Sequence, residues 1–439
     1  MKNKYKLIGL LLTAVSALFI IFLCLFLSYF NTCKTYRNQL ENLYEKNYYE
    51  TVSAINSLEV NMSKLVATTD LKSQSELLRD ISENCTTCSN NIGLLPLSYN
   101  KVTEINSLIN TISGFIESLS LANLDGDEIG EEDFNQLNSV HSRVQEVQYD
   151  LNLYLDKLKA DYNILDDVDF NNSEQNLFSG GLVGSESNLT KIPTLIYDGP
   201  FSDSVINKEI KGLENVEYTV GMAEEKLHSI FSGFAIEYLG DSEGKFSTYN
   251  FDVKGDVDLY VSVTKLGGFL LNITAFGSGD EIKLSTEDGV ALAEAFASDC
   301  GLKNMYSVWY QQTGNILYVN LAPIVNKVIY YPDLIKVKVD LSYGLVVGWE
   351  GVNYATNHVD RSFVSSVGIL EAQEKISPIL TVTERNFTII PDKYVGELSA
   401  YEFICTWKNY TYYIYIDSVT GEEANILRVV NTTNGDLLM

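Results

Sequence analysis

The apolar residues near the start of the chain form one long run. Between Leu7 and Phe30, only three serine or threonine residues and one glycine interrupt the apolar side chains. A helix of this length spans about 36 Å, which is enough to cross a hydrocarbon core of about 30 Å. The run has no small-residue cleavage site, so residues 7–30 indicate a transmembrane anchor rather than a signal peptide. Residues 1–6 include the basic Lys2, Lys4 and Lys6, which favour a cytoplasmic N-terminus and place the bulk of the chain outside the cytoplasm.

After the anchor, apolar residues recur every three or four positions, which is the spacing of one helix face. This pattern runs from Leu40 to Thr69, from Val102 to Leu119 and from Phe134 to Tyr162, with a break at residues 84–100. It predicts three amphipathic helices within a helical domain of residues 31–166. The helices suit either an antiparallel bundle or a coiled stalk that pairs between chains, so we expect self-association through this region as one alternative.

A polar stretch follows the predicted helices. From about residue 217, apolar and polar residues alternate along the chain. Asn, Ser, Asp and Gly dominate residues 167–191, which predicts a linker over 167–216 that is open to proteolysis. In the hairpin from Tyr413 to Val430, apolar and polar residues alternate on both sides of a Thr-Gly turn. Such alternation is typical of half-buried antiparallel strands.

Two earlier segments have the same alternating style, so the C-terminal part is predicted to use one small unit three times. Each unit combines one helix with an antiparallel sheet, and the predicted fold class is α+β. The helices are expected at 223–231, 285–298 and 367–376, the second opened by the capping-box sequence Ser285-Thr-Glu-Asp288. The three repeats are placed at 217–280, 281–360 and 361–439.

Charge narrows the range of partners. The net charge is -27 and the pI is about 4.4. An acidic surface repels phosphate backbones, so the sequence argues against nucleic acid as a partner.

The six cysteines contain a single CxxC, Cys85-Thr-Thr-Cys88, between predicted helices. A zinc site needs about four ligands, and a redox CxxC normally opens a helix after a strand. A local disulfide or two free thiols are therefore favoured over metal or redox work.

Candidate catalytic chemistry is sparse. The three histidines are His141, His228 and His358, and they lack the spacing of a metal site. The sequence contains no GxSxG, HExxH, P-loop or paired Cys-His signature. The acidic stretch from Asp125 to Asp133 resembles a calcium loop, but Ile129 stands where an oxygen ligand belongs. A carboxylate pair for glycoside hydrolysis stays open among 58 acidic residues, because that pair has no sequence signature. We expect a protein that is not an enzyme and holds no cofactor or metal.

Several motifs resemble the YpeB family of spore-germination proteins, whose repeats are PepSY-like. They are Tyr197-Asp-Gly-Pro-Phe-Ser202, the segment from Gly348 to Asn353 leading to Asn357-His358, Tyr401-Glu-Phe403 and Thr420-Gly-Glu-Glu423. The candidate partner-binding or family-motif positions are Tyr197, Asp198, Gly199, Pro200, Phe201, Trp349, Asn357, His358, Tyr401, Glu402, Phe403, Gly421, Glu422 and Glu423.

The resemblance implies a non-catalytic protein of the forespore or spore inner membrane, facing the cortex. Such a protein binds, localises and stabilises a cortex-lytic enzyme of the SleB type for cortex hydrolysis in germination. One alternative is an extracytoplasmic PepSY sensor or a protease-regulating protein, although the few residues before the anchor argue against a sensor. A weaker alternative is a peptidoglycan hydrolase.

Overall fold

The computed structural model forms two compact units, each of which is described by itself. The first comprises residues 1–66 and 75–192, and the second comprises residues 67–74 and 193–439. The residues that the structure describes are 2–95, 99–124, 129–159, 164, 201, 209–275, 279, 281–392, 396–432 and 435–438. Several predictions fall outside this set: the start of the calcium-like loop, the polar linker and the turn at Tyr197–Pro200.

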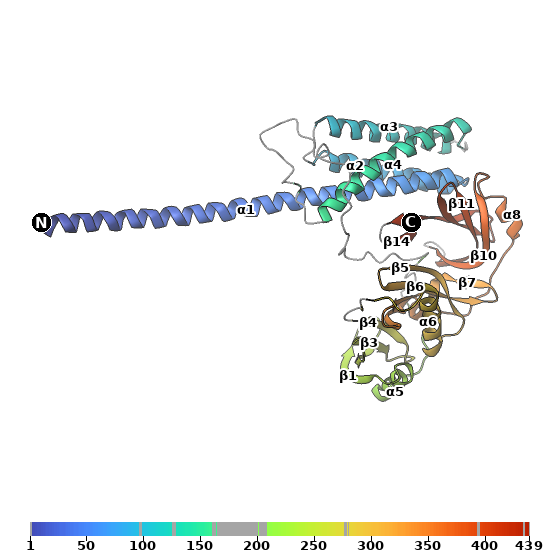
Figure 1. The fold of residues 1–439 in the computed structure, drawn as a ribbon. Coiled ribbons are helices and arrows are strands. Elements are labelled where there is room, and N and C mark those ends of the chain that lie inside the picture. The colour runs from blue at the N-terminus through green and yellow to red at the C-terminus, as the bar shows by residue number, and fades with distance from the viewer. Residues whose placement is uncertain are drawn as a thin grey trace. The chain divides into compact units, whose positions relative to one another are not determined.

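Helices build the first unit, and Figure 1 shows three of them beside the C-terminal part of the longest. The helices are α1 (Lys2–Ala67), α2 (Leu71–Ile92), α3 (Tyr99–Leu124) and α4 (Glu131–Lys159). The prediction of three helices was therefore wrong, because α2 occupies much of the expected break. Its helical face carries Leu78, Ile81 and Ile92, all buried.

The N-terminal part of α1 carries the predicted anchor. Among the described residues, α1 contains the one helix that is long and apolar enough to cross a membrane. Its side chains from Leu18 to Phe30 are largely exposed, including Phe22 and Leu25. A continuous exposed apolar surface of this kind is suited to lipid rather than to water.

Farther along, α1 supplies the core of the bundle. Ile55, Leu58 and Met62 are almost fully buried, as the predicted three-and-four spacing requires. A polar pair crosses the same core, with His141 Nε2 2.9 Å from Glu59 Oε1. Burying polar groups costs free energy unless they bond to each other, so this pair favours one register between α1 and α4.

Strands dominate the second unit, and its fold class is α+β as predicted. The elements are α5 (Val220–Ile230), β1 (Ala235–Ser242), β2 (Thr248–Lys254), β3 (Leu259–Thr264), β4 (Leu270–Ala275), α6 (Thr286–Asp299), β5 (Met305–Thr313), β6 (Ile316–Val325), β7 (Val328–Tyr330), η2 (Tyr331–Asp333), β8 (Ile335–Asp340), β9 (Leu345–Glu350), α7 (Val352–Asn357), α8 (Ile369–Gln373), β10 (Thr381–Asp392), β11 (Gly396–Trp407), β12 (Tyr410–Asp417), β13 (Glu423–Thr432) and β14 (Gly435–Leu438).

These strands form one 14-stranded sheet, in which the antiparallel sheets predicted for the three repeats are joined at their edges. The strand order is β1-β2-β3-β4-β9-β8-β6-β7-β10-β11-β12-β13-β14, with β5 paired to β6. Antiparallel pairing of β4 with β9 joins the first part of the sheet to the second. Parallel pairing of β7 with β10 joins the second part to the third, a pairing that the antiparallel prediction did not include.

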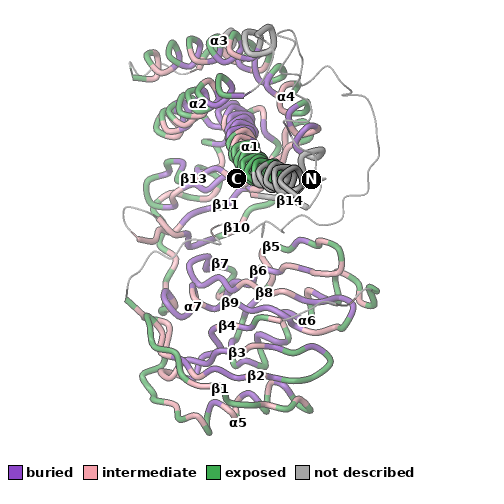
Figure 2. Tube along the Cα trace, turned by 90° about the vertical axis from the view of Figure 1, so that its left-hand side faces the viewer, coloured by how far each residue is buried: buried purple, intermediate pink, exposed green. Residues whose placement is uncertain are grey.

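The helices α5 and α6 share one core with the strands β2–β6, β8 and β9. Figure 2 shows the buried residues concentrated along these strands. The capping prediction for α6 is confirmed, because Asp288 N donates to Ser285 Oγ at 3.1 Å. The third predicted helix is shorter than expected: α8 has five residues, after which Lys375 and Ile376 bond in tighter turns before Pro378.

Candidate functional site

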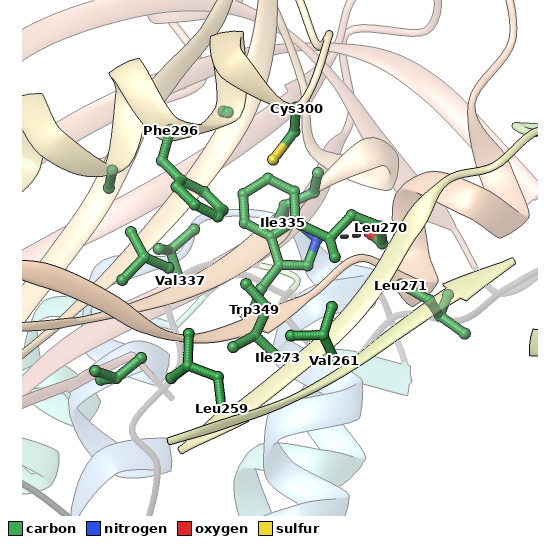
Figure 3. Close-up of a cluster of buried hydrophobic side chains, with 14 of the residues drawn as sticks. Leu259, Val261, Leu270, Leu271, Ile273, Phe296, Cys300, Ile335, Val337 and Trp349 are labelled. Carbon is green, nitrogen blue, oxygen red and sulfur yellow. Dashed lines mark hydrogen bonds between the residues drawn. The ribbon is translucent and has the colours of Figure 1, made fainter. Parts of the chain in front are cut away.

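Trp349, at the centre of the Gly348–Asn353 motif, lies in the shared core. Its side chain is 2% exposed, and its Nε1 donates to the carbonyl of Leu270 at 2.9 Å (Figure 3). The Phe296 ring meets it edge-on at 5.6 Å between ring centres. Since these contacts enclose the indole, Trp349 stabilises the core and presents little surface to a partner.

A second group of motif residues lies where β7 and η2 meet the chain beyond α7. Asp333, Asn357, His358, Arg361 and Glu397, called the junction cluster below, make a connected set of polar contacts. The Arg361 guanidinium binds both carboxylate oxygens of Glu397, at 2.7 and 2.8 Å. Its Nη1 also lies 2.7 Å from Asp333 Oδ2, and its Nη2 donates to the Asn357 carbonyl at 2.7 Å.

Two charged side chains of the junction cluster are buried, which increases the energetic importance of their pairing. The side chain of Asp333 is fully buried and that of Arg361 is 5% exposed. Burial by itself lowers the pKa of Arg361, but the carboxylates of Glu397 and Asp333 outweigh it and hold that pKa above its ordinary range. Charges removed from water in this way must be paired, so the cluster depends on all three groups being present.

His358 forms the outer edge of the junction cluster. Its Nδ1 lies 2.6 Å from Asp333 Oδ2, and its ring stacks on Tyr354 at 4.2 Å between centres. Tyr354 stacks in turn on Phe269 at 5.5 Å. Asn357 Nδ2 donates to the Pro332 carbonyl at 3.0 Å. The arrangement anchors the end of α7 to η2.

Among the described residues, no group of three or more His, Cys, Asp or Glu side chains is placed to hold a metal ion.

Glu402 occupies a separate buried position next to Tyr331 of η2. Tyr331 donates its hydroxyl to Glu402 Oε2 at 2.6 Å, and Asn386 Nδ2 lies 2.9 Å from Oε1. The ring of Phe201 packs at 5.3 Å from Tyr331 and at 5.0 Å from Tyr415. Burial raises the pKa of Glu402, and hydrogen bonds from Tyr331, Asn386 and Tyr415 offset this only in part.

This raised pKa predicts a specific pH dependence. The folded protein holds the Glu402 proton more tightly than the unfolded chain, so the stability from this group is complete below a pH of about 4.3. It is lost as the pH rises through the folded-state pKa, by up to about 1.4 kcal/mol per pH unit. We expect Glu402→Gln to remove this decline, as measured by urea unfolding in pH steps. The exposed Glu422→Gln is the matched control, and a Glu402→Gln slope equal to wild type contradicts the assignment.

Tyr401 and Phe403, the neighbours of Glu402, face the opposite side of β11. Alternate residues of a strand point to opposite faces, so this motif contributes to two cores. Tyr401 donates its hydroxyl to the Val367 carbonyl at 2.7 Å, and Phe403 is fully buried. Both residues therefore hold the third part of the sheet to the segment before α8.

The final motif is a turn, as predicted. Gly421 has a φ of +76°, which favours glycine, and its amide donates to the Asp417 carbonyl. Glu422 is exposed, whereas Glu423 is 8% exposed and accepts from Thr68 Oγ1 at 2.8 Å within the second unit. Of the residues in this motif, Glu422 alone offers a solvent-facing charge.

The structure thus brings some predicted positions together and separates others. Phe201, Asn357, His358 and Glu402 gather around η2, while Trp349 and the turn lie elsewhere. Sequence reasoning missed the residues that bind them: Tyr331, Asp333, Arg361 and Glu397. A proline-aspartate turn at η2 was the one local signal, because the remaining partners are distant in the chain.

The cysteines are free thiols, which decides between the two alternatives left open at Cys85 and Cys88. Both lie within α2, so the expectation that they fall between helices was wrong. Burial raises the pKa of Cys85 to about 11 and that of Cys88 to about 12. Burial also raises the pKa of Cys300 and of Cys405 to about 12.

Thiol labelling is expected to follow this burial. Since the thiolate is the reactive form, iodoacetamide at pH 7.5 should modify Cys33, which is exposed, and leave Cys85, Cys88, Cys300 and Cys405 unmodified. In urea, all of them should react. Mass spectrometry of the digested protein measures each site, and native labelling of the CxxC at the rate of Cys33 contradicts the buried placement.

Two family models match the chain. Residues 32–163 match the model described as YpeB N-terminal, and residues 178–364 match YpeB sporulation, PepSY1 and PepSY2 domains. Together the two matches cover well over half of the chain.

Two similar proteins share one name with each other, and each is similar to this chain over most of its length. The "Sporulation protein YpeB" of Halalkalibacterium halodurans is 24% identical over 419 residues, which is 88% of this chain and 90% of that protein. The protein of that name from Bacillus subtilis is 24% identical over 414 residues, 89% of this chain and 90% of its own. The solved "Bacillus megaterium YpeB C-terminal domain" has a TM-score of 0.45 and 23% identity, and the match covers 49% of this chain and 99% of that domain.

Proposed function

Because the chain belongs to the YpeB family of sporulation proteins and carries PepSY domains, we propose that it binds, localises and stabilises a cortex-lytic enzyme of the SleB type without catalysing a reaction itself. This protein would keep the hydrolase in place until the cortex is degraded during germination.

One observation supports the non-catalytic part of the proposal. Of the candidate motif residues that the structure describes, Trp349, Phe403 and Asn357 are buried, and Glu402 is 1% exposed. Catalytic acids and bases need access to a substrate within hydrogen-bond reach. Motif residues enclosed in cores instead support a scaffold whose fold is the functional requirement.

We also propose the location. The apolar part of α1 would anchor the protein in the spore inner membrane, with its start in the cytoplasm and the other residues facing the cortex. The basic residues Lys2, Lys4 and Lys6 support this direction, because positive charge is retained on the cytoplasmic side. Protease accessibility of a C-terminal tag in intact and in lysed forespores tests it.

Affinity capture tests the partner class. The full-length protein with a C-terminal tag is solubilised from spore membranes in mild detergent and purified. We expect a cortex-lytic hydrolase to co-purify with this protein. The control is an unrelated tagged single-pass protein from the same membranes, with which the hydrolase should not co-purify. A protease recovered in its place would support the protease-regulating alternative and would overturn the proposal.

A direct assay tests the hydrolase alternative. The purified full-length protein is incubated with decoated spore cortex, and released muropeptides are measured by chromatography. The proposal expects no release from this protein and release from an added cortex-lytic enzyme. Muropeptides released by the protein alone would assign it the enzymatic role.

A further inference from the structure

A cavity of about 420 Å³ opens between the segment before α5 and the ends of β2 and β3. Three aromatic rings line it: Tyr218, Phe246 and Tyr249. Charged side chains of both signs also line it, among them Lys245 and Glu217. The volume lies within the range of about 300–1,000 Å³ that is typical of ligand pockets.

Hydrogen bonds and close packing fix the aromatic walls. Tyr249 donates its hydroxyl to the Tyr218 carbonyl at 3.0 Å, and the Tyr218 amide donates to the Lys265 carbonyl at 2.8 Å. The Tyr218 ring lies directly on Gly268, where an added Cβ would fall 2.1 Å from the ring. A cavity with walls held in this way loses little conformational entropy when it binds.

Lys265 forms ion pairs in the wall of the cavity. Lys265 Nζ lies 2.5 Å from Glu243 Oε1 and 2.9 Å from Asp241 Oδ2. Ser247 donates to the other oxygen of Glu243. These contacts commit Lys265 and Glu243 to each other and make them part of the wall.

Lys245 and Glu217 provide a second pair of opposite charges on the same lining. Lys245 Nζ lies 3.3 Å from Thr356 Oγ1 and 5.5 Å from the centre of the Phe246 ring. Glu217 is exposed, and its backbone bridges to Leu266. A ligand that uses this cavity therefore meets aromatic rings, a cation and a carboxylate together.

We propose that this cavity binds a short peptide segment in which an aromatic side chain is flanked by residues of opposite charge. The aromatic side chain enters among Tyr218, Phe246 and Tyr249, the peptide carboxylate approaches Lys245, and its cation approaches Glu217. This inference goes beyond the proposed function and does not depend on it, because the site selects a peptide chemistry whatever protein supplies the peptide.

The expected contributions are unequal. Burying an aromatic side chain contributes more to binding than an exposed ion pair does. Replacing the peptide's phenylalanine by alanine should therefore weaken binding about 10-fold or more, whereas removing one charge pair should weaken it about 2- to 5-fold. Aromatic contact supplies affinity, and the charges supply orientation.

Fluorescence anisotropy with the full-length protein in nanodiscs tests the proposal. The probes are fluorescein-labelled Gly-Lys-Phe-Asp-Gly, Gly-Lys-Ala-Asp-Gly and Gly-Gln-Phe-Asn-Gly. We expect the first to bind most tightly and the alanine peptide most weakly. Equal affinity of the phenylalanine and alanine peptides, or no saturable binding of any probe, overturns the proposal.

Variants of the exposed charges locate the binding site. Lys245→Gln should weaken the Lys-Phe-Asp peptide about 2- to 5-fold and leave the neutral Gln-Phe-Asn peptide unchanged. Lys254→Gln is the matched control, because Lys254 is an exposed lysine of β2 outside the cavity. If both variants change the charged peptide's affinity equally, the peptide binds elsewhere and the assignment is wrong.

Discussion

Arg361→Ala is expected to lower the free energy of unfolding of the second unit by about 3–5 kcal/mol. The side chain is 5% exposed and lies between the carboxylates of Asp333 and Glu397. Removing it leaves two carboxylates close together, one of them fully buried, with no cation from Arg361. An uncompensated buried charge costs far more than the loss of an exposed pair, so the effect should be large.

Urea unfolding monitored by tryptophan fluorescence measures this effect. All three tryptophans of the chain, Trp309, Trp349 and Trp407, lie in the second unit, so the signal reports on that unit. Lys254→Ala is the control: its ammonium is 2.9 Å from Glu237 but half exposed, and no measurable change is expected. Equal stability of the Arg361 and Lys254 variants would show that the junction cluster contributes little.

Trp349→Ala is expected to cost about 3–5 kcal/mol, for a different reason. The substitution leaves a cavity between Phe296, Cys300 and the sheet, as the packing in Figure 3 indicates. It also removes the donor to the buried Leu270 carbonyl, which then has to find another partner. The cavity and the lost hydrogen bond both lower the free energy of unfolding.

The fluorescence of Trp309 and Trp407 reports on unfolding of this variant. Trp349→Phe keeps a ring but removes the donor, so its loss should be smaller than that of alanine. Trp407→Ala is the control with the same chemical change at a partly exposed site, and it should cost less than Trp349→Ala. A larger loss at Trp407 contradicts the assignment of the main core.

The sequence was most informative where a pattern is local. The Tyr413–Val430 alternation predicted the β12–β13 hairpin, and the pairing of Tyr413 with Leu427 confirms it. Alternation works because each residue's environment depends on its own strand face. The capping box before α6 was predictable for the same reason, since its partners are three residues apart.

The missed helix α2 has a physical explanation. Asn, Thr, Cys and Ser fill its second half, and these residues have modest helix propensity. Cys85 and Cys88 were predicted to lie between helices, as a local disulfide or two free thiols, although they continue the buried stripe of Leu78 and Ile81 at helical spacing. Free cysteine behaves as a small apolar residue in a core, and counting it as one reveals the helix.

The junction cluster left no comparable signal. Arg361 binds Asp333 and Glu397, which lie 28 and 36 positions away, and each alone is an ordinary charged residue. The joining of three expected sheets into one was equally hidden, because the pairing of β4 with β9 and of β7 with β10 depends on edges brought together by folding. Local patterns determine strand faces, whereas edge partners are chosen by tertiary packing.

The amount of cortex-lytic enzyme in dormant spores tests the central claim most directly. Immunoblots compare spores that lack this protein with spores that carry the wild-type chain. The proposed function predicts that the hydrolase is undetectable without the protein and returns to its normal level when the wild-type chain is restored. Normal hydrolase levels in spores that lack the protein would contradict the claim that it stabilises the enzyme.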